Sequence, residues 1–174
     1  MRRLLLLRHA KTERAQPGER DRDRKLTERG RADAPIIGAY MVRHRLVPDL
    51  ALVSPVVRTQ ETWQLVADCF TKAPRAVKEE RIYNAAPATL SAVIRGTRNA
   101  PTLLLIGHNP GLHELSVALI ASGDVNARER INEKLPTSGL VVIDFPIDDW
   151  SELHGSAGRL DRFVTPRLIA EATD

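Results

Sequence analysis

Cysteine, aromatic residues and long apolar runs are scarce in this chain of 174 residues. Its single cysteine, Cys69, excludes an internal disulfide and any zinc site built from several cysteines. Apolar runs such as residues 4–7 fall far short of the about 20 residues that span a bilayer. Arg8 interrupts this first run before the hydrophobic region of a signal peptide can form. We therefore expect a protein of the reducing cytoplasm that does not bind membranes.

Aromatic residues make up 4% of the chain, and hydrophobic and charged residues make up an ordinary 43% and 28%. The length suits one domain that covers residues 1–174. The net charge is +4, and 21 of the 26 basic residues are arginine. Arginine suits the recognition of phosphate and carboxylate groups, but genome composition also explains an excess of arginine. Composition alone does not choose between these explanations.

Short apolar runs alternate with amphipathic segments, which is typical of α/β proteins. Six stretches have the composition of strands: residues 4–7, 50–53, 76–77, 101–107, 140–145 and 160–164. Three stretches have the apolar spacing or flanking residues of helices: residues 63–70, 87–95 and 112–119. The polar residues 123–136 predict an insertion or a lid.

The region between the first two strands predicts a loop and then a helix. Residues 11–25 are rich in charge and indicate an exposed loop of unusual length. Thr27 is a possible helix N-cap, but Gly30 and Pro35 weaken a helix that starts there. We therefore place the start at Asp33, which would cap a helix with Pro35 in its first turn.

Histidine and arginine follow three of the predicted strands. Arg8 and His9 end the first strand, Arg58 follows the second, and His108 follows residues 101–107. The carboxyl ends of neighbouring strands meet at one edge of an α/β sheet, and ligands bind there. A lone histidine is more often structural, but four such residues at equivalent strand ends predict one shared site. The histidines without this placement are expected on the surface or in packing: His44, His113 and His154.

These residue types suit phosphoryl chemistry. A neutral imidazole nitrogen can attack phosphorus and carry the phosphoryl group as phosphohistidine. Guanidinium groups hold the phosphoryl oxygens with paired hydrogen bonds and keep their charge at every working pH. A second histidine can donate a hydrogen bond to the same oxygens as charge shifts in the transition state.

The chain resembles the histidine phosphatase superfamily, which includes the phosphoglycerate mutases, and within it the short bacterial SixA-type phosphohistidine phosphatases. The resemblance covers nearly the whole chain, and its strength lies in the order and spacing of several motifs. These are LLLLRHAK at residues 4–11, DRKLTERG at 23–30, SPVVRTQET at 54–62, IGHNPG at 106–111, LPTSG at 135–139 and TP at 165–166.

The resemblance implies a three-layer α/β/α sandwich around a mainly parallel sheet, and a phosphatase that needs neither a cofactor nor a metal. It implies that His9 is the phosphoryl-accepting nucleophile and that Arg8 and Arg58 clamp the phosphate. By the same resemblance His108 is the second histidine, which stabilises the phosphoryl oxygens. Arg24 matches a basic position that helps to hold the substrate.

One departure from the family pattern concerns the general acid. Larger relatives carry a glutamate that protonates the leaving oxygen, in the region that follows the third strand. Glu79 and Glu80 lie near that region, either as the acid or as solvated charges beside Arg81. Phosphohistidine needs less help than an ester, because an imidazole with a proton on its other ring nitrogen leaves in the neutral form. The lack of a clear acid therefore favours phosphohistidine as substrate.

The predicted function is the dephosphorylation of phosphohistidine on a partner protein. One alternative is a phosphomonoesterase that uses the same residues on small phosphorylated metabolites. A second alternative is a non-catalytic basic module that binds nucleic acid, but the chain has no RNA-binding motif and no aromatic platform among its basic residues. The sequence does not indicate the oligomeric state.

Overall fold

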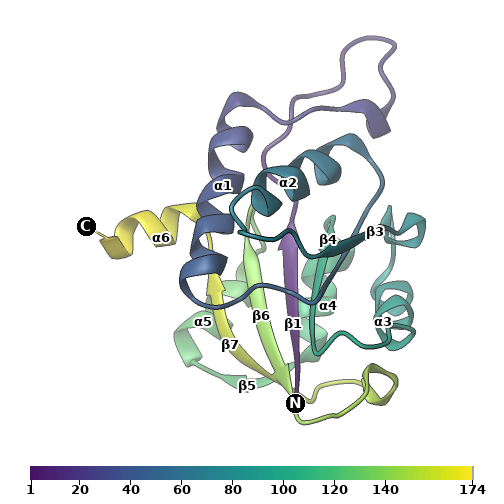
Figure 1. Ribbon diagram of the computed structural model, residues 1–174, viewed down its shortest axis with the longest axis vertical. Coiled ribbons are helices and arrows are strands. Elements are labelled where there is room, and N and C mark those ends of the chain that lie inside the picture. Colours follow the sequence, from purple (N-terminus) through teal and green to yellow (C-terminus); the bar gives the residue numbers. More distant parts are fainter. Residues whose placement is uncertain (174) are drawn as a thin grey trace.

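The computed structural model describes residues 1–173, which form a seven-stranded sheet with helices on both faces (Figure 1). The strands are β1 Arg2–Arg8, β2 Leu50–Val53, β3 Arg75–Lys78, β4 Thr102–Gly107, β5 Ile120–Gly123, β6 Leu140–Phe145 and β7 Gly158–Val164. The α-helices are α1 Glu28–Arg43, α2 Val57–Ala67, α3 Pro87–Arg95, α4 Gly111–Leu119, α5 Val125–Glu133 and α6 Pro166–Thr173. The short 3-10 helices are η1 Asp21–Asp23, η2 Glu80–Ile82 and η3 Trp150–Glu152.

The leucine runs explain why β1 and β4 occupy the interior of the sheet. The side chains of residues 4–7 in β1 and 103–106 in β4 are fully buried. Leu4 and Leu6 pack into a core with α3, α4 and α5, while Leu5 and Leu7 pack into a second core with α1 and α2. A strand that is buried on both faces needs a helical layer on each side. The predicted three-layer sandwich is therefore confirmed.

The strand order is β3-β2-β4-β1-β6-β7-β5, and it brings three strand ends together. β1 and β2 both pair in parallel with β4, whereas β6 runs antiparallel to β1 and to β7. The carboxyl ends of β1, β2 and β4 therefore lie at the same edge of a mainly parallel sheet. The long segment between β1 and α1 lies at this end of the molecule, uppermost in Figure 1.

Helix α1 begins earlier than the sequence predicts. It starts at Glu28, and the Thr27 side chain accepts a hydrogen bond from the Gly30 backbone N–H, so the predicted start at Asp33 is wrong. Gly30 is required by packing, because a Cβ there would overlap the backbone carbonyl of Lys11. Pro35 lies inside the helix, where it removes one backbone hydrogen bond without ending the helix.

The polar stretch 123–136 contains helix α5, so the predicted insertion or lid is wrong. Ala127 and Ile131 bury one side of this helix in the core, and His113 of α4 donates a hydrogen bond to the Ile131 carbonyl oxygen at 2.6 Å. Strand β5 and helix α6 are additions to the predicted elements. Within residues 1–173, no helix has the length and apolar character needed to cross a membrane.

Candidate active site

A cavity of about 350 Å³ lies at the carboxyl ends of β1, β2 and β4. Its lining residues are Arg8, His9, Lys11, Thr12, Arg24, Arg58, Asn84, His108, Asn109 and Thr137. The structure thus brings together all four residues predicted from the strand ends, together with Arg24. Four of the lining side chains are arginine or lysine, and none is acidic. Such a cavity suits an anion that carries more than one negative charge.

His9 follows β1 directly, and its ring is held in one orientation. The residue is only 7% exposed, and its Nδ1 lies 2.8 Å from the carbonyl oxygen of Ala10. Because a carbonyl can only accept a hydrogen bond, Nδ1 carries the proton and Nε2 keeps a free lone pair in the neutral ring. Burial, with a further contribution from the charges of Arg8 and Arg58, lowers the pKa of His9 to about 4. His9 is therefore a neutral imidazole at pH 7 with a nucleophilic Nε2.

His108 follows β4, and its ring centroid lies 5.4 Å from that of His9. Its Nε2 lies 2.7 Å from the Ser54 hydroxyl oxygen, at the end of β2. Burial, with further contributions from the His9 ring in its protonated form and from the charge of Arg58, lowers the pKa of His108 to about 3. The two histidines are therefore a neutral pair at pH 7. A hydrogen bond from one ring and a lone pair from the other can then act on the same ligand.

Arg58 lies in the first turn of α2 and is only 6% exposed. Its guanidinium donates to the backbone carbonyl of Asp21 at 2.9 Å and to the Asp21 carboxylate at 3.1 Å. Asp21 belongs to η1, in the long segment that follows β1. This segment therefore holds the guanidinium of Arg58 in place from a position 37 residues away in the chain.

Asp21 lies beside the cavity and contacts its residues, and the sequence alone does not single it out. Its carboxylate accepts hydrogen bonds from Tyr83 at 2.5 Å, from Arg24 at 2.9 Å and from Arg58. The hydrogen bond from Tyr83, followed by those from the two guanidinium groups, keeps the pKa of Asp21 well below its usual range. Asp21 stands in a run of alternating charges, and nothing in that run distinguishes it from its neighbour Asp23.

Arg24 and Arg8 are the other two arginines that line the cavity. Arg24 donates to the Thr12 hydroxyl at 2.8 Å as well as to Asp21, so both bonds fix its guanidinium. Arg8 donates to the carbonyl of Leu135 at 3.1 Å. Burial lowers the pKa of Arg8, but a guanidinium loses its proton only far above neutral pH, so Arg8 remains a cation at pH 7.

Several buried polar atoms around the cavity have no hydrogen-bond partner among residues 1–173. They include Arg8 Nε, His108 Nδ1, Asn109 Oδ1 and Ser138 Oγ. Ser138 follows the lining residue Thr137 and adopts a φ of 60°, an uncommon conformation for a residue other than glycine. Unpaired buried polar groups are costly unless a ligand satisfies them. Their position beside the cavity is consistent with a polar ligand.

Glu79 and Glu80 do not reach this cavity. Glu79 binds Arg81 at 2.9 Å, and Glu80 binds Arg22 at 2.8 Å with its own side chain 68% exposed. These ion pairs lower the pKa of both carboxyl groups, which are therefore ionised at pH 7. An ionised carboxylate outside the cavity is poorly suited to donate a proton there. Within residues 1–173, no group of three His, Cys, Asp or Glu residues has the arrangement of a metal site.

Comparisons with known proteins agree with this geometry. A family model described as "Histidine phosphatase superfamily (branch 1)" matches residues 4–82. A candidate phosphohistidine phosphatase SixA of known structure from Agrobacterium tumefaciens is 34% identical, with a TM-score of 0.81 over 95% of this chain and 98% of that one. An uncharacterized protein from Mycobacterium tuberculosis is 35% identical over 92% of this chain and 100% of its own length. The protein histidine phosphatase SixA complexed with tungstate shares the fold at 19% identity, with a TM-score of 0.72 over 96% of this chain and 99% of that one.

Proposed function

The chain belongs to the histidine phosphatase superfamily, in its SixA-type branch, and is a phosphatase, and from this we propose that it hydrolyses phosphohistidine on a partner protein. The observation that carries the proposal is the hydrogen bond from His9 Nδ1 to the Ala10 carbonyl, inside a cavity walled by cations. It leaves His9 Nε2 as a neutral nucleophile beside a site for a phosphoryl group.

In the first step His9 Nε2 attacks phosphorus, and the bond between phosphorus and the substrate's ring nitrogen breaks. The electron pair of that bond stays on the leaving imidazole, which is neutral because its other nitrogen already carries a proton. In the second step water attacks the phosphoryl group on His9, and the bond between phosphorus and Nε2 breaks with its electron pair on Nε2. The water oxygen and one of its protons stay on the released hydrogen phosphate, and the other proton goes to solvent. His9 leaves as a neutral imidazole, because Nδ1 keeps its proton on the Ala10 carbonyl throughout.

The remaining cavity residues bind the phosphoryl group and stabilise its negative charge. Arg8 and Arg58 hold the phosphoryl oxygens, whose charge spreads during the displacement. His108 donates a hydrogen bond to the same oxygens from a preorganised position, and Arg24 holds the bound substrate.

The surroundings of Glu79 and Glu80 favour phosphohistidine over a phosphate monoester. An alkoxide leaving group needs a proton, and general-acid help is worth about 10²–10⁴-fold in rate. Both glutamates are ionised and engaged in ion pairs outside the cavity. A phosphoramidate bond breaks without such help, so the cavity matches phosphohistidine better than a small phosphomonoester.

The test measures phosphate release from a histidine-phosphorylated phosphocarrier protein, from phosphoramidate and from a panel of phosphate monoesters. We expect a higher kcat/KM for the two phosphoramidate bonds than for every ester. The enzyme should also form an alkali-stable, acid-labile phosphoryl adduct that His9→Ala abolishes. His154→Ala is the matched control, because His154 is exposed and, within residues 1–173, its side chain bonds to the backbone carbonyl of Glu152. Full activity of His9→Ala, or a clear preference for esters, would contradict the proposal.

A further inference from the structure

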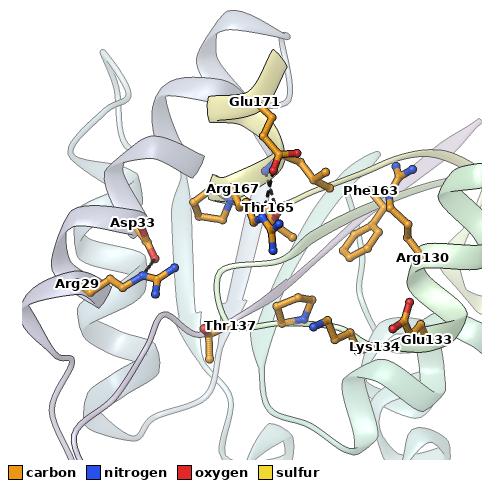
Figure 2. A pocket seen from close by; sticks show the side chains of 13 residues that line it. Arg29, Asp33, Arg130, Glu133, Lys134, Thr137, Phe163, Thr165, Arg167 and Glu171 are labelled. Carbon is orange, nitrogen blue, oxygen red and sulfur yellow. Dashed lines mark hydrogen bonds and ion pairs between the residues drawn. The ribbon is translucent and has the colours of Figure 1, made fainter. Parts of the chain in front are cut away.

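A second cavity, of about 440 Å³, adjoins the candidate active site (Figure 2). Thr137 lines both cavities, so the two are neighbours at the surface. The second cavity lies between α1, the end of α5, β7 and α6. Phe163, Pro136, Pro166 and Leu168 supply its apolar part. We call the second cavity the side groove.

Charged side chains surround the side groove. Figure 2 shows Arg29 and Lys134 on opposite sides of Thr137, with Arg167 above it. Arg29 pairs with Asp33 of its own helix at 3.5 Å, and Arg167 pairs with Glu171 of its own helix at 3.0 Å. The charges of Arg29 and Arg167 are therefore largely balanced by carboxylates of their own helices.

Arg130 and Lys134 differ from the other two cations of the side groove. Neither has a carboxylate within ion-pair distance among residues 1–173, and both are exposed. Arg130 lies in the last turn of α5, and Lys134 follows the helix directly with an extended backbone, so both line the side groove where α5 ends. Cations that the protein leaves without partners at a groove are available to a bound ligand.

The two cavities together concentrate the positive charge of the molecule. Eight cationic side chains and three carboxylates line them, an excess of five positive charges, although the whole chain carries only +4. The rest of the molecule therefore has no net positive charge. The excess exceeds what one phosphoryl dianion needs, and half of the cations lie in the side groove beyond the phosphoryl site.

We propose that the side groove binds an acidic polypeptide segment that flanks the phosphohistidine of the partner protein, with Arg130 and Lys134 pairing with its carboxylates. This inference rests on the proposed function and adds the chemistry of the partner. A polypeptide fits better than RNA, because the ring of Phe163, which lines the side groove, is only 4% exposed and cannot stack on bases.

The test uses three peptides of equal length, each with one phosphohistidine flanked by glutamate, glutamine or lysine residues. We expect kcat/KM to fall in that order, with the glutamate peptide about tenfold above the lysine peptide, and the difference to shrink with added salt. Arg130→Gln combined with Lys134→Gln should lower kcat/KM for the glutamate peptide about fivefold, as for two lost ion pairs at the rim of an interface. Hydrolysis of phosphoramidate and of the glutamine peptide should not change.

The matched control combines Lys72→Gln with Arg75→Gln, which removes the same charge as the test variant. Both residues lie in or near β3, at the edge of the sheet opposite to β7 and β5, which neighbour α5 and α6. This control should behave as wild type with all three peptides. An equal loss in the control would show that only net charge matters and would overturn the side groove as a docking site. Competition by polyuridylate as strong as that by an acidic peptide of equal charge would also overturn it. A wild-type enzyme that cleaves phosphoramidate without preferring the glutamate peptide refutes the docking site alone, whereas inactivity on every phosphoramidate bond refutes the proposed function.

Discussion

Acidification should leave His9 neutral over a wide range of pH. The pKa of His9 is lowered to about 4, against 6.5 for an exposed histidine, because its ring is buried. At pH 5.5 a histidine with the ordinary pKa is only about 10% neutral, whereas a pKa of 4 leaves about 97% neutral. The proposed nucleophile, His9, is therefore expected to stay neutral more than a unit of pH below the range in which an exposed histidine becomes protonated.

Long-range ¹H–¹⁵N NMR of the imidazole rings measures this directly between pH 3.5 and 8. We expect the His9 signals, assigned with the His9→Gln variant, to show a proton on Nδ1 and a bare Nε2 down to a pH near the lowered pKa. The physical reason is the 2.8 Å hydrogen bond to the Ala10 carbonyl together with burial. A titration midpoint near 6.5, or a proton on Nε2, would refute the assignment of His9 as a preformed nucleophile.

The same lowered pKa makes stability depend on pH. Between pH 6.5 and about 4 the unfolded chain binds a proton at His9 that the folded protein excludes, so the free energy of unfolding falls as pH falls through this range. For His9 alone the loss amounts to about 3 kcal/mol once the pH is below 4. Urea denaturation of wild type and of His9→Gln at pH 7, 5.5 and 4.5 should show a shallower loss in the variant. The same loss in both proteins would contradict burial as the cause.

Three further substitutions test the surroundings of the site. Asp21→Asn should lower kcat about tenfold, because the Arg58 guanidinium loses an anchoring carboxylate. Phosphate inhibition should not weaken, since a negative charge leaves the neighbourhood, and weaker inhibition with unchanged kcat would argue against this positioning role. Glu80→Gln should keep kcat within about twofold, and a 10²-fold loss would instead identify Glu80 as the general acid. Gly30→Ala should lower the free energy of unfolding by about 1–3 kcal/mol in thermal or urea denaturation, because its Cβ meets the Lys11 carbonyl, whereas helix propensity alone predicts a gain.

The central strands could be predicted because their sequence carries the signal locally. Apolar runs such as residues 4–7, bounded by charged or turn-forming residues, read as strands buried on both faces. The start of α1 could not be predicted in this way. Gly30 looked like a weakness in a helix, and only the close approach of the Lys11 backbone explains it. Helix α5 has no clear signal in the sequence, because only Ala127 and Ile131 mark its buried side in an otherwise polar segment.

In the candidate site, too, some residues could be predicted from the sequence and others could not. His9 and His108 could be selected from the sequence because each directly follows an apolar strand of the type that lies inside a parallel sheet. Asp21 could not, because its importance comes from contacts with side chains 37 and 62 residues away. The sequence does not decide whether Glu80 is an acid or a solvated charge, and its ion pair with Arg22 is likewise visible only in three dimensions.

The sequence by itself determined the fold class, the strands whose ends meet and the family to which the chain belongs, because periodicity and motif spacing are local properties. Only the tertiary structure decided that the Ala10 carbonyl selects the tautomer of His9 and that Asp21 orients Arg58. It also decided that the excess positive charge gathers around two adjoining cavities. These features depend on distances of about 3 Å between groups from different elements, and the folding of the sheet sets such distances.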